Sequence, residues 1–163
     1  MGGCCRPGDY DKLFDEKNAR AKAREYARKG LNDDALRIVD FVRGRLSPGY
    51  SVLEVGGGVG AIPSADVVVM QRVVCCYPDV DALVGAAADH ARRLLLLTFP
   101  VERWWIRVGL AAENALFRLR GSTFRSFVHS TATVLAVAQR HGMRVAEHHR
   151  GLIWQVVALE RTG

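Results

Sequence analysis

Glycines alternate with other residues directly after a short apolar run, and this spacing suits close contact with a ligand. The stretch Ser51–Gly60 reads SVLEVGGGVG. Gly56, Gly58 and Gly60 have no Cβ atoms, so their backbone can turn sharply and approach a bound molecule closely. Glu54 places a carboxylate beside the same loop. These residues therefore predict a ligand-binding loop.

The apolar run before the glycines indicates the element that positions this loop. Val52, Leu53 and Val55 follow the turn residues Pro48-Gly49 and are mostly β-branched. Such a run between turn residues and glycines predicts a buried parallel strand. Ligands of open α/β sheets bind outside the carboxyl ends of parallel strands. The glycines would fall at that edge.

The pattern E-x-G-x-G-x-G resembles the cofactor loop of class I S-adenosylmethionine-dependent methyltransferases. The resemblance implies S-adenosylmethionine as the cofactor. In that family the glycine loop packs under the cofactor and the acid lies close to its amino-acid end. Carried over, the cofactor-binding residues are Glu54, Gly56, Gly58 and Gly60, with Gln71 beside them at the end of the next strand.

A dinucleotide-binding loop is an alternative reading of the same glycines. Gly56, Gly58 and Ala61 fit G-x-G-x-x-A. The acid expected about 20 residues later in a nicotinamide-binding domain would be Asp79. That residue follows Pro78, outside any predicted strand. The residues that follow the loop favour the methyltransferase.

The predicted order of elements also resembles that family. Two helices precede the glycine-loop strand, and in the second Asn32 is placed to cap the helix while Leu36, Val39, Val42 and Leu46 share one face. The predicted elements are helices 10–29, 33–46, 81–91, 101–119 and 130–141, buried strands 67–70 and 93–99, and a closing hairpin of 143–149 with 152–160. The tail TFP…R-x-x-F-x-H-S…HGMRV…W-x-V-V-A-L-E is similar to magnesium-protoporphyrin and related small-molecule methyltransferases.

A short interval after the glycines departs from the family pattern. Only ten residues, 56–65, separate the first strand from one that resembles the family's fourth, whereas each strand–helix unit takes roughly 30 residues. The resemblance therefore implies that the segment between the first and fourth strands is absent. We predict an α/β fold with a truncated Rossmann-like methyltransferase sheet, mainly parallel with a C-terminal antiparallel hairpin. An antiparallel hairpin through the glycines is the rival arrangement.

The missing segment turns the first strand into a predicted sheet edge. An apolar edge strand is a template for pairing with another chain, so we expect a homodimer or poor solubility. Two functions remain open at this point. One is methylation of a small-molecule acceptor, which loss of the segment could impair. The other is a non-catalytic methyltransferase-fold remnant that acts by self-association or protein interaction.

The chain divides into a predicted helical lid or cap, residues 1–46, and an α/β core, residues 47–163. Relatives carry an N-terminal helix over the cofactor, and Tyr10 and Phe14 would suit such a lid as substrate contacts, together with Trp104. A solvated first helix is the alternative for this region. Tyr77 and His129 lie in segments that border the active site in relatives, so they are the catalytic candidates. A structural role for His129 is the alternative.

Composition limits the partners. The 163 residues carry a net charge of +6, but much of the excess is spread along predicted helices, which argues against nucleic-acid binding. No apolar run is long enough to cross a bilayer, so no membrane partner is expected. The four cysteines form two adjacent pairs without zinc-site spacing. We expect reduced thiols, no metal and a cytoplasmic location.

Overall fold

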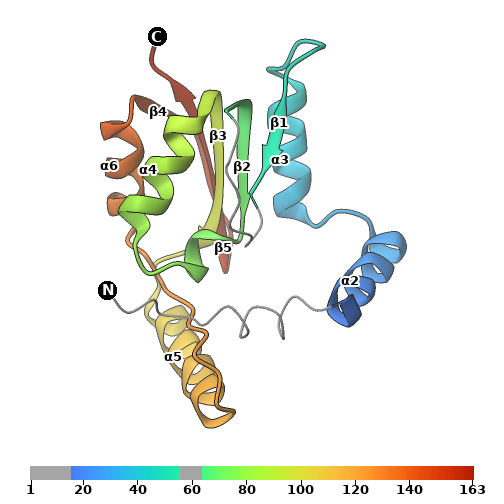
Figure 1. Ribbon diagram of the computed structural model, residues 1–163, viewed down its shortest axis with the longest axis vertical. Helices are drawn as coiled ribbons and strands as arrows, with labels where there is room; N and C mark the ends of the chain where they lie inside the picture. The colour runs from blue at the N-terminus through green and yellow to red at the C-terminus, as the bar shows by residue number, and fades with distance from the viewer. Residues whose placement is uncertain (1–15, 56–63) are drawn as a thin grey trace.

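A five-stranded mixed sheet forms the centre of the protein (Figure 1). The computed structural model describes residues 16–55 and 64–163. Within these, the strands lie in the order β1-β2-β3-β5-β4. They are β1 Val52–Glu54, β2 Ala65–Gln71, β3 Ala91–Pro100, β4 Met143–Arg150 and β5 Trp154–Arg161.

The sheet combines parallel and antiparallel pairing as the sequence predicts. β1 pairs parallel with β2, with Leu53 opposite Val68, and β2 pairs parallel with β3. β5 is antiparallel to both β3 and β4, so the chain closes on an antiparallel hairpin. The predicted parallel order of β1 and β2 is confirmed, and the rival hairpin through the glycines is excluded.

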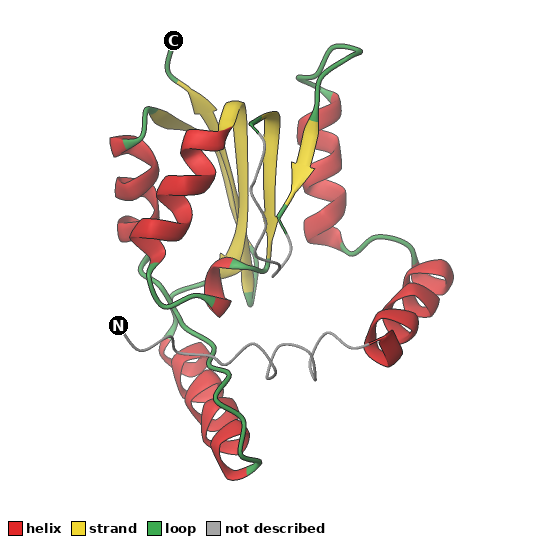
Figure 2. Cartoon of the chain, in the orientation of Figure 1, coloured by secondary structure: helices red, strands yellow, loops and turns green. Residues whose placement is uncertain are grey.

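Helices cover both faces of the sheet (Figure 2). α4 (Val80–His90) and α6 (Thr131–Arg140) lie together on one face, and α3 (Asp33–Arg43) lies on the other. α2 (Glu16–Lys29) and α5 (Trp104–Leu119) stand apart from the sheet (Figure 1). A short 3₁₀ turn, η1 (Val74–Cys76), links β2 to α4.

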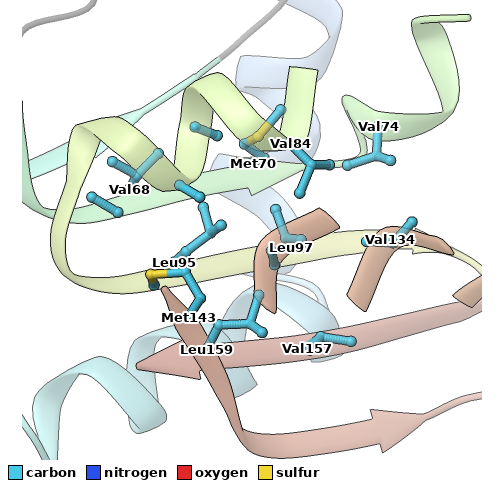
Figure 3. Packing of buried hydrophobic residues seen from close by; sticks show 14 of the residues in the cluster. Val68, Met70, Val74, Val84, Leu95, Leu97, Val134, Met143, Val157 and Leu159 are labelled. Carbon is cyan, nitrogen blue, oxygen red and sulfur yellow. The ribbon is translucent and has the colours of Figure 1, made fainter. Parts of the chain in front are cut away.

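The central strands are apolar throughout because both of their faces are covered. Side chains alternate between the two faces along a strand. Leu95 and Leu97 pack with Val84 of α4 and Val134 of α6, as Figure 3 shows. Leu96, one residue away, belongs instead to the cluster beneath α3. The continuous run RLLLLTF in β3 follows from this arrangement.

α3 presents a different face to the sheet from the one predicted. Asn32 Oδ1 accepts a hydrogen bond from the Ala35 N–H at 2.9 Å, which confirms the predicted N-cap. The buried residues are Ala35, Ile38 and Phe41. Leu36 is exposed, so the prediction that it belongs to the packed face was wrong. The buried residues are three positions apart along the helix and form the row that faces the sheet. Val42 and Leu46 are partly buried and pack at the margin of this contact. The division of the chain at residue 46 stays a prediction.

A reciprocal set of hydrogen bonds joins the amino ends of β1 and β2. The backbone N–H and hydroxyl of Ser51 donate to Asp66 Oδ2 at 2.9 and 2.8 Å. The Asp66 N–H in turn donates to Ser51 Oγ at 3.0 Å. The hydrogen bonds from Ser51 lower the pKa of the Asp66 carboxyl, since they stabilise its charged form. We call these two residues the Ser51–Asp66 clasp.

Candidate cofactor site

Two of the predicted cofactor residues lie at the carboxyl ends of neighbouring parallel strands. Glu54 ends β1 and is paired with Val69 of β2, and Gln71 ends β2 two residues further on. Glu54 is exposed, and Gln71 is half-buried. Both therefore reach the edge where open α/β sheets bind ligands. The predicted glycines Gly56, Gly58 and Gly60 lie outside the described residues.

The third parallel strand continues the same edge. Thr98 of β3 is paired with Gln71, and its carbonyl accepts the Arg72 N–H at 3.1 Å. The Thr98 side chain is fully buried, and its Oγ1 has no hydrogen-bond partner within the described part of the chain. A polar atom buried without a partner is uncommon. The carboxyl edge is thus built from Glu54, Gln71 and Thr98 on three adjacent strands.

Arg72 turns the chain away from the end of β2. Its φ of 58° lies in the left-handed region, which residues other than glycine seldom adopt. Its guanidinium pairs with Asp34 Oδ2 at 3.0 Å and lies 4.6 Å above the Trp154 ring. These contacts hold an unfavourable backbone conformation beside the candidate site. Nothing in the sequence distinguished this arginine, because its role depends on the partners that the fold supplies.

Adjacent thiols follow this turn. The Sγ atoms of Cys75 and Cys76 lie 3.9 Å apart. The hydrogen bond between the two thiols, together with burial, raises the pKa of Cys75. The same bond lowers the pKa of Cys76. Neither Cys75 nor Cys76 takes part in a disulfide within the described residues.

The two catalytic candidates are in contact, but Tyr77 takes part through its main chain and not through its side chain. His129 Nε2 donates to the Tyr77 main-chain carbonyl at 2.8 Å, and the His129 ring stacks on Phe127 with centroids 6.0 Å apart. The Phe127 N–H donates to the Cys75 carbonyl at 2.7 Å. These bonds fasten the segment before α6 to the segment after β2. They give His129 a structural contact, and in the neutral ring they leave Nδ1 as the basic nitrogen.

The predicted substrate contacts are not assembled by the described residues. Trp104 begins α5 with 77% of its surface exposed. Tyr10 and Phe14 lie outside the described residues. Asn114 of α5 exchanges two hydrogen bonds with the Ser126 backbone, each 2.8 Å long, and so joins this helix to the segment that carries His129. These bonds tie α5 to the segment that carries His129.

Solved structures show what this arrangement resembles. The chain is similar to magnesium protoporphyrin IX methyltransferase (ChlM) from Synechocystis PCC 6803 with bound SAH, with a TM-score of 0.65 and 17% sequence identity, over 94% of this chain and 98% of that one. The structure of the same enzyme with bound SAM gives a TM-score of 0.57 and 16% identity, over 94% and 97% of the two chains. The chain has the class I methyltransferase fold. No family model and no curated protein matches the sequence.

The methyltransferase fold accounts for the position of the candidate site. Its parallel strands bring Glu54 and Gln71 to one edge, as the resemblance implies. Among the described residues, no three His, Cys, Asp or Glu side chains gather closely enough to hold a metal ion. None of the described helices combines the length and apolar character that crossing a bilayer requires.

Proposed function

We propose that the protein binds S-adenosylmethionine at the carboxyl edge of β1 and β2 and transfers its methyl group to a small-molecule acceptor. The observation that carries the proposal is the parallel pairing of β1 with β2, in which Glu54 and Gln71 are the last residues of two neighbouring strands. The similar fold of the magnesium protoporphyrin IX methyltransferase, solved with bound SAM and with bound SAH, supports the same cofactor.

Each residue at the edge has a distinct task in this proposal. S-adenosylmethionine supplies an activated methyl group for an in-line displacement, so the protein's main task is to align the acceptor with it. Glu54 attracts the cofactor's ammonium group through its exposed carboxylate, and Gln71 offers both a donor and an acceptor. His129 would accept a proton at Nδ1 only if the acceptor must lose one, because general base catalysis serves no purpose otherwise.

The alternative is a methyltransferase-fold remnant that acts by self-association. One observation favours it. β1 has only three residues and forms the end of the sheet in the described part of the chain, with Val52 56% exposed. The resemblance to class I methyltransferases implies that the family's second and third strands, which would cover this edge, are absent. A remnant of this kind would have lost cofactor affinity and kept an exposed edge.

Titration calorimetry of the full chain with S-adenosylhomocysteine and with S-adenosylmethionine tests the proposal. We expect sub-millimolar binding of both. Glu54→Gln should weaken binding about 10- to 100-fold, because a hydrogen bond to a charged group is worth roughly 1.5–3 kcal/mol. Glu147→Gln is the matched control, since this exposed glutamate lies on β4 at the opposite end of the sheet.

The two functions predict different calorimetric results. No heat of binding at millimolar ligand would reject the cofactor site and favour the remnant. Equal loss of affinity in Glu54→Gln and Glu147→Gln would show that the ligand binds elsewhere.

A further inference from the structure

The 3₁₀ turn after β2 directs two adjacent thiols to the same side. In an extended strand, neighbouring side chains point to opposite faces. Here Cys75 and Cys76 lie in η1, and both sulfur atoms approach the Arg72 carbonyl oxygen, at 3.6 and 3.7 Å. The two sulfur atoms are 3.9 Å apart, which is close enough for both to bind the same atom.

A bond within the turn and contacts from three other parts of the fold hold this turn in place. The Cys76 N–H donates to the Val73 carbonyl at 2.9 Å, and the Cys75 carbonyl accepts the Phe127 N–H. Arg72 enters the turn in a left-handed conformation, fixed by its ion pair with Asp34 and its contact with the Trp154 ring. The thiols are therefore placed before any ligand arrives, which lowers the entropic cost of binding.

The spacing of the sulfur atoms suits a single bridging ion. Two sulfurs bound to one tetrahedral ion at the usual Zn–S length of 2.3 Å lie about 3.8 Å apart. Cys75 is buried, whereas Cys76 is half-buried, so a small species would reach the pair from the side of Cys76. Among the described residues, no third His, Cys, Asp or Glu completes the set. The pair thus selects species that require only two sulfur ligands.

We propose that Cys75 and Cys76 form a dithiol site that captures a thiophilic species requiring two sulfur ligands, such as a monosubstituted trivalent arsenical. With phenylarsine oxide, two As–S bonds form, and the two thiol protons leave with the arsenic-bound oxygen as one water molecule. Arsenic stays trivalent, so no oxidant or reductant is required. The site is independent of the methyl transfer proposed above.

Phenylarsine oxide and intact-mass spectrometry test the site. Cys4 and Cys5 form a second adjacent pair, so the test uses the full chain carrying Cys4→Ser and Cys5→Ser. We expect one adduct per chain that survives excess monothiol and is released by a small dithiol. Adding Cys76→Ser should weaken capture about 100-fold, because the second sulfur no longer acts intramolecularly. Cys76 is half-buried, so its replacement preserves the packed core, which circular dichroism would check.

Three results would overturn the proposal. One is the absence of an adduct when Cys75 and Cys76 are the only cysteines. Another is an adduct that a monothiol removes as readily as a dithiol does, since that indicates binding to one sulfur. The third is equal capture after Cys75→Ser and Cys76→Ser are added to the chain that already carries Cys4→Ser and Cys5→Ser, which would show that these thiols are not required.

Discussion

Gln155 organises a buried polar network where β5 meets α6. It is 1% exposed, and its Nε2 donates to the Pro100 carbonyl at 3.1 Å and to Thr131 Oγ1 at 3.0 Å. Its Oε1 accepts a hydrogen bond from His148 Nε2 at 2.8 Å. One amide therefore serves β3, α6 and β4 at once. Buried groups of this kind are costly to leave without partners.

Replacing Gln155 with methionine should destabilise the protein by about 1–3 kcal/mol, because methionine fills a similar volume but leaves the Pro100 carbonyl and Thr131 hydroxyl unpaired. Urea unfolding followed by circular dichroism would measure the loss. Gln139→Met, at an exposed position on α6, is the matched control and should change stability by less than about 0.5 kcal/mol. Equal urea midpoints for Gln155→Met and Gln139→Met would show that the hydrogen-bond network around Gln155 contributes no stability.

At the scale of elements, the Ser51–Asp66 clasp holds the shortest strand in parallel register. The pKa of Asp66 is lowered in the folded protein by its bonds from Ser51, relative to an ordinary value of 3.8. A carboxyl with a lowered folded pKa stabilises the fold above its unfolded pKa, and this contribution disappears as the pH falls through the folded pKa. The clasp should therefore weaken in acid.

Ser51→Ala should make the stability of the protein depend less on pH under acidic conditions. It removes the hydroxyl bond to Asp66 and keeps the backbone one, so the melting temperature should fall less steeply than that of the wild type as the pH drops below about 5. Thermal melts from pH 7 to pH 3 would measure both slopes. Ser64→Ala, an exposed serine outside the clasp, should keep the wild-type slope. If the melting temperatures of the wild type and Ser51→Ala fell with the same slope, the hydroxyl bond to Asp66 would make no pH-dependent contribution to stability.

The elements were largely predictable because their patterns are local. The run RLLLLTF predicted a strand covered on both faces, and Asn32 predicted the start of α3. The packed face of α3 was less predictable, since Leu36 and Ile38 are equally apolar and only the position of the sheet decides between them. At the site, Glu54 and Gln71 were implied by the resemblance to the methyltransferase loop, and both lie at strand ends. The convergence of Arg72, Asp34 and Trp154 depends on segments far apart in the sequence.

On the scale of the whole molecule, the sheet ends at β1 with an outward-facing backbone. The Val67 N–H donates to the Ser51 carbonyl at 3.0 Å, and the Val55 N–H donates to the Val69 carbonyl at 2.8 Å. Alternate residues of a strand bond the same neighbour, so the peptide groups of Val52 and Glu54 point away from β2. Within the described residues no strand lies beyond them. Such an edge favours pairing with a second copy.

We predict a weak dimer that forms through β1 and dissociates on dilution, because a three-residue edge offers few hydrogen bonds. Val52→Pro should shift the equilibrium to monomer, since it removes an outward-facing N–H and leaves the bonds to β2 in place. Val52→Lys should do the same by adding charge to the edge. Light scattering after size-exclusion chromatography, over a wide concentration range, would measure the masses. A wild-type monomer at every concentration would refute the dimer, and a dimer that persists in both folded variants would locate it on another surface.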